Sequence, residues 1–144
     1  MLPKSGGILE LVEGAIKPRR AHEGDGGMDI AIQEDYTIPP YSSVKMPAGV
    51  KLHLPSHLVA NVMTRSGTCD KGVYVIPTLI DCNYHNEIST IVSNFSDKPV
   101  KIYKGDMLAQ VVLNLAFSFD NEYELLEKPV KKRGYNDKFG SSGN

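Results

Sequence analysis

One aspartate in this sequence stands where it can act on a water molecule. Asp81 follows the short β-prone run Thr78-Leu79-Ile80, and the aromatic ring of Tyr84 comes three residues later. A carboxylate that is ionised at neutral pH can accept a proton from water, and a nearby ring can limit the shape of a bound ligand. An aspartate here can also simply cap a tight turn, because aspartate is common in turns. The segment alone leaves both interpretations open.

Two other segments are glycine-rich: the first is predicted to be a loop in which the backbone approaches another group closely, and the second could cradle a phosphate. The stretch from Glu23 to Gly27 contains three glycines in four residues and follows the basic run Lys17-Pro18-Arg19-Arg20. Near the C-terminus, Phe139-Gly140-Ser141-Ser142-Gly143 combines glycines with two hydroxyls, and Arg133 precedes it. Glycines let backbone N–H groups converge on an anion, and hydroxyl and guanidinium groups can donate to it. The composition of the C-terminal stretch is equally typical of a disordered tail.

Length, charge and cysteine content limit the kind of protein. The 144 residues suggest one domain, and 16 basic against 17 acidic residues give no overall field that favours nucleic acid or an anionic membrane. Cys69 and Cys82 form neither a disulfide framework nor a metal-ligand spacing. No apolar run approaches the length of a membrane span, and no signal-peptide core is visible. We therefore expect a soluble intracellular protein, in the cytoplasm or nucleus, with a viral origin as one possibility, and no nucleic-acid or membrane partner.

The segments that position these groups have the pattern of short strands. Apolar and β-branched runs recur every 8–12 residues, with proline and glycine between them, which predicts an all-β sandwich or barrel. The longest apolar run, Leu108 to Leu115, is expected to be a strand buried on both faces. The other predicted strands are Ile8–Val12, Met28–Ile32, Tyr36–Ile38, Val44–Leu54, Leu58–Met63, Val73–Ile76, Leu79–Asp81, Ile88–Phe95 and Val100–Tyr103.

Five stretches together resemble the deoxyuridine triphosphatase (dUTPase) family. They are Asp25-Gly26-Gly27-Met28-Asp29-Ile30, Arg65-Ser66-Gly67, Leu79-Ile80-Asp81 with Tyr84, Lys104-Gly105-Asp106-Met107-Leu108-Ala109-Gln110, and Arg133-Gly134 to Phe139-Gly140-Ser141-Ser142-Gly143. Each stretch alone is weak, but their order and near-family spacing across almost the whole chain are specific. The resemblance implies a distorted jelly-roll, β-barrel-like subunit in a homotrimer whose active sites are shared between chains. It also implies Mg²⁺-dependent hydrolysis of dUTP to dUMP and pyrophosphate, which limits uracil in DNA and supplies dUMP for thymidylate synthesis.

The resemblance also assigns roles to residues. Asp81 would be the catalytic base, and Asp29 would hold Mg²⁺ indirectly, through water. Arg65, Ser66, Gly67 and Gln110 would bind the phosphates. The chemistry agrees, because a triphosphate carries about four negative charges that arginine and Mg²⁺ neutralise well.

The remaining implied contacts concern the base, the sugar and the terminal phosphate. Main-chain groups of the hairpin that contains Thr78, Leu79 and Ile80 would bind uracil, and Tyr84 would exclude a ribose 2′-hydroxyl. Residues 1–127 would form the core, and residues 128–144 would form an arm that closes over the nucleotide. In that arm Phe139 would stack on the base, while Arg133, Ser141 and Ser142 would hold the terminal phosphate beside Gly140.

The sequence departs from the family pattern at several places, including Met28 in place of the usual aromatic residue and Asn86 in place of glycine. Thr78 stands where the family usually has glycine, His85 stands where it commonly has arginine, and Lys138 replaces a glycine in the last motif, with one extra residue between Arg133 and Phe139. These changes bear on catalytic efficiency and base specificity more than on the fold.

Two alternatives remain open at this point. A dUTPase-like protein that has lost efficient turnover could act as a nucleotide sensor or bind a partner protein, although a pure binder has no need of Asp81. A deoxycytidine triphosphate deaminase shares the fold, but it needs a glutamate about ten residues beyond Asp81, where this chain has Ile91.

Overall fold

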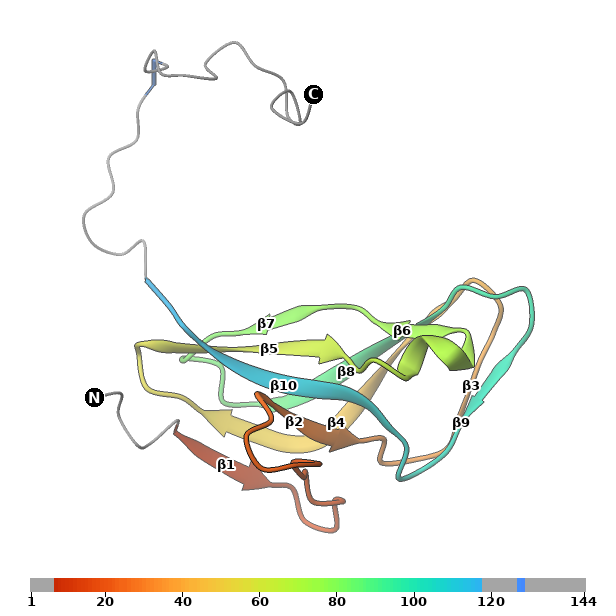
Figure 1. Cartoon of the computed structure of the whole chain (residues 1–144), viewed down its shortest axis with the longest axis horizontal. Coiled ribbons are helices and arrows are strands. Elements are labelled where there is room, and N and C mark those ends of the chain that lie inside the picture. The colour runs from red at the N-terminus through yellow and green to blue at the C-terminus, as the bar shows by residue number, and fades with distance from the viewer. Residues whose placement is uncertain (1–6, 118–126, 129–144) are drawn as a thin grey trace.

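Ten β-strands and one short 3₁₀ helix make up the described part of the computed structural model, which covers residues 7–117 and 127–128 (Figure 1). The helix, η1, spans Thr68–Lys71. The strands are β1 (Ile8–Leu11), β2 (Gly27–Ala31), β3 (Tyr36–Ile38), β4 (Ser43–His53), β5 (Leu58–Thr64), β6 (Val73–Val75), β7 (Thr78–Ile80), β8 (Glu87–Asn94), β9 (Val100–Ile102) and β10 (Met107–Leu115).

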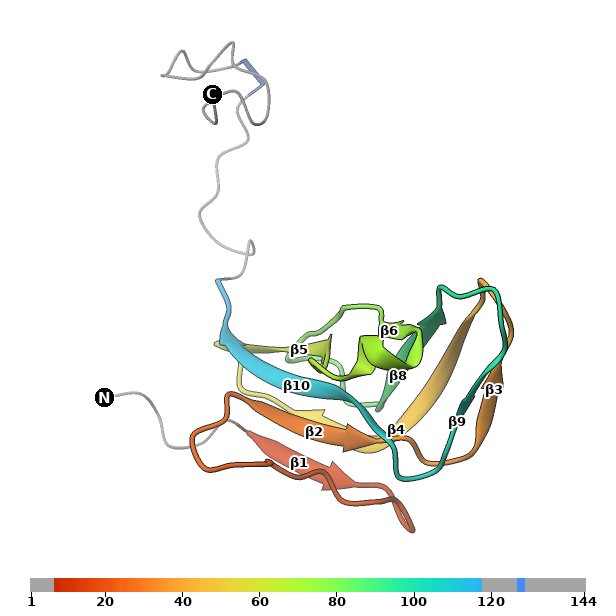
Figure 2. The same ribbon diagram turned by 45° about the vertical axis from the view of Figure 1, so that its right-hand side comes forward.

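The strands form two four-stranded sheets and a two-stranded ribbon. One sheet has the order β1-β4-β8-β6, the other has the order β2-β10-β5-β7, and β3 pairs with β9. Every pairing is antiparallel. Figure 2 shows the two sheets facing each other, with the β3–β9 ribbon at one end. Two facing sheets with mixed strand order are the layered all-β architecture that the strand spacing predicts.

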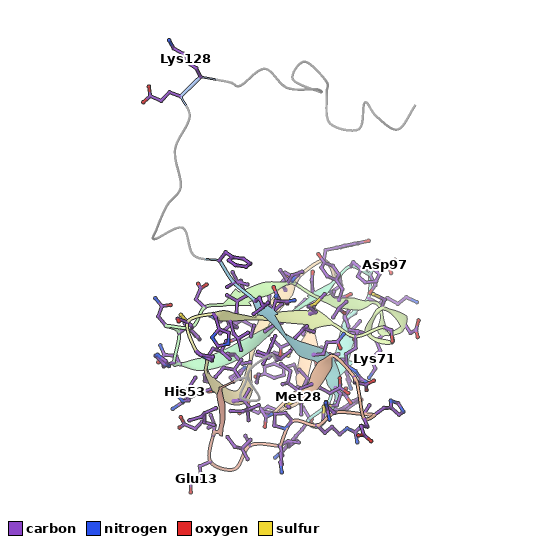
Figure 3. The ribbon with its side chains drawn as sticks, turned by 60° about the vertical axis from the view of Figure 1, so that its left-hand side comes forward. Glu13, Met28, His53, Lys71, Asp97 and Lys128 are labelled. Carbon is purple, nitrogen blue, oxygen red and sulfur yellow. The ribbon has the colours of Figure 1, made fainter. Side chains whose placement is uncertain are left out.

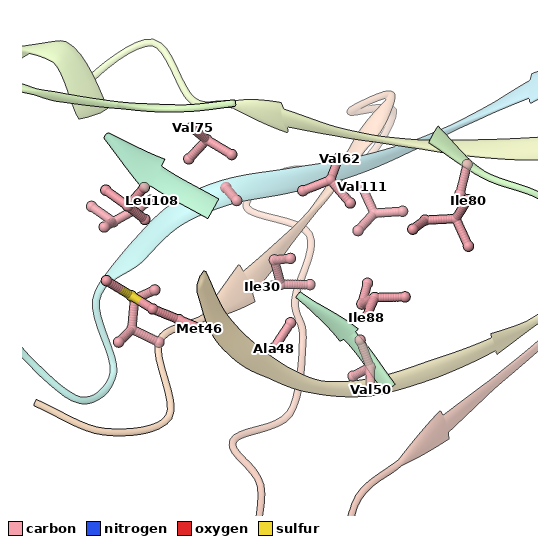
Figure 4. Close-up of a cluster of buried hydrophobic side chains, with 14 of the residues drawn as sticks. Ile30, Met46, Ala48, Val50, Val62, Val75, Ile80, Ile88, Leu108 and Val111 are labelled. Carbon is pink, nitrogen blue, oxygen red and sulfur yellow. The ribbon is translucent and has the colours of Figure 1, made fainter. Parts of the chain in front are cut away.

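The core lies between the sheets and follows from strict alternation along the strands. In β8, Ile88, Thr90, Val92 and Asn94 are buried while the residues between them are partly exposed, since successive side chains of a strand point to opposite faces. Aliphatic side chains from both sheets meet in one cluster (Figure 4).

The last part of β10 corrects one expectation from the sequence. This strand is not buried on both faces along its length, because Leu113 is 42% exposed and Leu115 is 58% exposed. β10 pairs with β2 only as far as Val112 and continues to Leu115 beside β5 alone. An apolar run therefore predicts too much burial where a strand extends beyond the end of a neighbouring strand.

The other predicted strands agree with the structure to within a residue or two. Sequence patterns did not predict η1, which begins after Gly67 and ends at Gly72, whose φ of 78° is left-handed. Among the described residues, no helix is long and apolar enough to cross a membrane. The division into residues 1–127 and 128–144 stays a prediction, because residues 118–126 and 129–144 lie outside the described part.

Candidate functional site

Asp29 and Arg65 form an ion pair at one end of the second sheet. Asp29 lies in β2 directly opposite Gln110 of β10, and Arg65 follows the last residue of β5. The Nε atom of Arg65 is 3.0 Å from Oδ1 of Asp29, and a terminal guanidinium nitrogen donates to the carbonyl of Met107 at 2.8 Å. Two fixed contacts hold the guanidinium in one orientation while a third of the side chain stays exposed. The arginine can therefore still bind an anion.

The second carboxylate oxygen of Asp29 has a different environment. Oδ2 is buried and has no hydrogen-bond partner among the residues that the structure describes. A buried carboxylate oxygen without a partner is costly, and water or a cation is its usual partner. Asp29 lines a polar hollow, so its donor chemistry fits a hydrated Mg²⁺ ion, which prefers oxygen ligands and keeps several waters.

Gln110 lies beside this pair, and the position of its side chain depends on the absence of a Cβ atom at Gly27. Its Nε2 donates to the carbonyl of Thr64 at 3.1 Å. A Cβ atom at Gly27 would lie 2.1 Å from Oε1 of Gln110, closer than any real contact. Gly27 is therefore required for close approach of the Gln110 side chain, which explains one of the glycines in the loop after Glu23.

Two polar hollows meet at Arg65 and Ser66. One has a volume of about 290 Å³ and includes Asp29, Gly27 and Gln110 in its wall. The other has a volume of about 490 Å³ and includes Gly67, Arg19 and Lys71. The second wall has three cationic groups and, among the described residues that line it, Asp106 as its one acid, and this balance of charge suits a polyphosphate.

Arg19 and Lys71 were not assigned to the site from the sequence. The backbone of Arg19 forms an isolated bridge with Asp29, its N–H donating to the Asp29 carbonyl at 3.0 Å. Lys71 comes from η1, and its Nζ lies 3.5 Å from Oδ2 of Asp106. The basic run around Arg19 was a visible signal, but its pairing with β2 is a tertiary contact. Lys71 lies in no comparable basic run.

Asp81 and Tyr84 lie in the exposed loop between β7 and β8. The backbone N–H of Tyr84 donates to the carbonyl of Asp81 at 3.1 Å, and its hydroxyl donates to the carbonyl of Glu87 at 3.2 Å. β7 is the last strand of its sheet, so one of its edges offers backbone N–H and C=O groups that no neighbouring strand of that sheet pairs. Thr78 pairs with Val62 in β5 and keeps a buried hydroxyl without a described partner.

The structure does not bring Asp81 to the Arg65 hollow within one chain. β7 runs beside β5 (Figure 1), with Ile80 opposite Ala60 and Thr78 opposite Val62. Asp81 therefore lies beyond Ala60, towards the start of β5, whereas Arg65 follows its end. At about 3.3 Å per residue, this places them roughly 20 Å apart along the strand.

The structure groups the remaining predicted residues as follows. Asp29, Arg65, Ser66, Gly67 and Gln110 lie together, and Thr78, Leu79, Ile80, Asp81 and Tyr84 form a separate group. Arg133, Phe139, Gly140, Ser141 and Ser142 lie outside the described residues.

Comparisons with known proteins point to one family. A sequence model described as dUTPase matches residues 13–143. The deoxyuridine 5′-triphosphate nucleotidohydrolase of Clostridium novyi is 37% identical over 134 residues, covering 91% of this chain and 93% of that protein. The protein of the same name from Paramecium bursaria Chlorella virus 1 is 32% identical over 137 residues, covering 94% and 96%.

Solved structures show the same fold. The dUTPase of Staphylococcus bacteriophage 80alpha with dUPNHPP superposes with a TM-score of 0.83 at 24% identity, covering 95% of this chain and 98% of that one. A phage phi11 dUTPase mutant, described with a structural Mg(II) ion, has a TM-score of 0.74 at 22% identity, covering 84% and 96%. This likeness confirms the all-β fold expected from the sequence.

Proposed function

The chain belongs to the dUTPase family, and from that premise we propose that it hydrolyses dUTP to dUMP and pyrophosphate. The observation that carries the proposal is the Asp29–Arg65 pair beside Gln110, at the wall shared by two polar hollows. The products fit the role of limiting uracil in DNA and supplying dUMP for thymidylate synthesis.

The hollows around Arg65 bind the triphosphate. The Arg65 guanidinium is held by Asp29 and Met107, so it meets a phosphate with little loss of side-chain entropy. Ser66 supplies an exposed hydroxyl, and Gly67 allows close approach of backbone. Gln110 donates to a phosphate oxygen from its place beside the Asp29–Arg65 pair.

Mg²⁺ is the metal that this donor set suits. Asp29 would hold the hydrated ion through water, and the ion would neutralise charge on the phosphates. The described residues contain no cluster of three or more His, Cys, Asp or Glu side chains able to hold a metal. Most of the ligands would therefore be phosphate oxygens and water.

Asp81 accepts the proton of the water that attacks the α-phosphorus. Its carboxylate is exposed at the end of β7, next to the strand edge whose backbone groups match the donors and acceptors of uracil. Tyr84 packs against the deoxyribose and excludes a 2′-hydroxyl. Arg133, Phe139, Gly140, Ser141 and Ser142 complete the site over the base and terminal phosphate.

A homotrimer with shared sites reconciles these two groups of residues. Asp81 and Arg65 lie far apart within one chain, so a complete site needs Asp81 from one subunit and Arg65 from another. The sheet that carries both groups also exposes large apolar side chains, including Met63 at 44% and Leu79 at 56%. Such residues on a sheet face are typical of a subunit interface.

The test is pyrophosphate release from dUTP, dCTP, dTTP and UTP with Mg²⁺, for the native chain and Asp81→Asn. We expect release from dUTP alone and its loss in the variant, with dUTP binding retained. Tight dUTP binding without release by the native chain would contradict the enzyme and leave the sensor alternative. Ammonia from dCTP would indicate a deaminase. The intracellular location stays a prediction.

A further inference from the structure

Two histidines join the loop that carries Asp81 to a different sheet. His53 ends β4, and His85 lies in the loop between β7 and β8, one residue after Tyr84. Their Nδ1 atoms are 2.9 Å apart, and the two rings meet edge to edge, with centroids 5.1 Å apart and planes inclined by 18°. Among the described residues, this is the only side chain to side chain hydrogen bond made by residues 81–86.

The contact continues to β1. Nε2 of His53 lies 2.7 Å from Oε2 of Glu10, whose other oxygen lies 3.6 Å from Nζ of Lys51. The hydrogen bond from His53, reinforced by the Lys51 charge, holds the pKa of the Glu10 carboxyl below its usual value. Glu10 is therefore an anion at neutral pH, and Nε2 of His53 must carry a proton towards it.

The number of protons on the two rings limits the protonation states in which the His53–His85 hydrogen bond can form. A hydrogen bond between two Nδ1 atoms needs one proton between them, so at most one of the two rings is an imidazolium while the contact lasts. If both rings are protonated, two N–H groups and two positive charges face each other at 2.9 Å, and the contact opens. The other charged and titratable groups on the neighbouring segments are Glu10 on β1, Lys51 on β4, Glu87 at the start of β8, and Asp81, Cys82 and Tyr84 in the loop.

We propose that the His53–His85 contact is a clasp that positions the Asp81–Tyr84 loop for the reaction, and that protonation of both rings releases it. The proposal rests on the proposed function, because it concerns the same loop. His53 and His85 are positioning residues and touch no substrate. In Figure 3, His53 lies far from Lys71, which lines the phosphate hollow. The clasp therefore acts on the Asp81 part of the site.

The first test measures kcat/KM for dUTP and UTP in the native chain, His53→Ala, His85→Ala and the double variant. We expect each change to lower the dUTP/UTP ratio about fivefold, the loss of one hydrogen bond, or about 1 kcal/mol at 1.36 kcal/mol per tenfold. The double variant should lose no more than either single variant, because both remove the same contact. His85→Asn keeps a polar atom near the Nδ1 position and should retain most of the ratio.

The control is Lys51→Gln, which removes the charge beside Glu10 but leaves the two rings in contact. Its dUTP/UTP ratio should match that of the native chain.

The pH dependence of dUTP turnover is a second measurement. Native dUTP turnover should fall on acidification as the second ring becomes protonated and the contact opens, and the alanine variants should lack this dependence. A merely structural role would lower stability and leave the ratio and the pH profile unchanged.

Hydrogen–deuterium exchange of the nucleotide-free protein separates this proposal from the proposed function. Both alanine variants should exchange faster than the native chain in the peptide that covers residues 81–86 and not in the peptide that covers β5. Unchanged exchange together with an unchanged ratio would overturn the clasp. If the variants exchange faster over residues 81–86 but the native chain releases no pyrophosphate from dUTP, the proposed function is wrong and the clasp is supported.

Discussion

Gly27 and Gln110 meet across β2 and β10, and their contact leaves no room for a side chain at position 27. In Gly27→Ala the new methyl group displaces the flexible amide of Gln110 and not the backbone. We therefore expect kcat/KM for dUTP to fall at least about tenfold, while the free energy of unfolding changes by less than about 1 kcal/mol. Steady-state kinetics and thermal unfolding measure the two effects.

Gly26 provides the matched control, because a Cβ there would meet nothing within 4 Å. Gly26→Ala should keep native activity. Equal activity losses in both variants would mean that the loop as a whole, and not the Gln110 contact, requires glycine.

The phenol of Tyr36 contributes to the pH dependence of the free energy of unfolding. Burial raises the pKa of the Tyr36 phenol above its usual value of 10, and the nearby Glu34 carboxylate raises it further. A raised pKa in the folded state means that this stability is complete below about pH 10 and is lost as pH rises through the folded value. In Tyr36→Phe, the midpoint of thermal unfolding should therefore fall less steeply above pH 10 than in the native chain. Parallel alkaline limbs would contradict this expectation.

The residues of the candidate site divide by the kind of signal they leave in the sequence. Asp29, Arg65 and Gln110 lie in recognisable motifs, and the structure places them side by side. Lys71 in the wall of the hollow and His53 outside it lie in no such motif, because a lysine in a short 3₁₀ helix and a histidine at a strand end look like ordinary surface residues. Only the packing of distant strands gives them partners.

Strands β8 and β10 show why the alternation of apolar and polar residues predicts the strands of this fold so well, and where it fails. A period of two fixes which residues of β8 face the core, so strand positions follow from sequence to within a residue or two. The length of the neighbouring strands is a tertiary property, and this is why the exposure of Leu113 and Leu115 was not predicted. The η1 turn is too short to show a period.

Two buried threonines allow a matched test of how a hydrogen bond to a buried hydroxyl affects the free energy of unfolding. Thr90 in β8 is 1% exposed, and its hydroxyl has no described partner. Thr68 in η1 is 2% exposed, and its hydroxyl donates to the carbonyl of Leu108 at 2.6 Å. Thr90→Val should raise the free energy of unfolding by about 1 kcal/mol, and Thr68→Val should lower it by about the same amount or more. Urea unfolding measures both.

The opposite signs are the informative part of that comparison, because both substitutions are the same chemical change. If Thr90→Val destabilises the protein, the Thr90 hydroxyl makes a stabilising hydrogen bond in the folded state, and the expectation is wrong.

Among the residues that the structure describes, the Arg65 hollows lie past the end of β5 and the Asp81 loop lies near its start. Under the proposed function these are two halves of a site, and neither half reaches a nucleotide held by the other half in the same chain. The proposed homotrimer would bring the two halves together, because in a closed ring each subunit meets one neighbour with its Asp81 loop and the other with its Arg65 hollows. The same geometry predicts that two different inactive variants can complement each other.

We therefore expect Asp81→Asn and Arg65→Gln to be inactive alone and active when mixed. After unfolding and refolding together in equal amounts, random assembly pairs an intact Asp81 with an intact Arg65 in about a quarter of the sites. dUTP turnover should approach about a quarter of the native value, and mixing without refolding should give less. Co-purification through a tag on one variant verifies that mixed assemblies form. Mixed assemblies with no activity would mean that each chain uses its own Asp81 and Arg65, and the loop after β7 would then have to move by most of the length of β5.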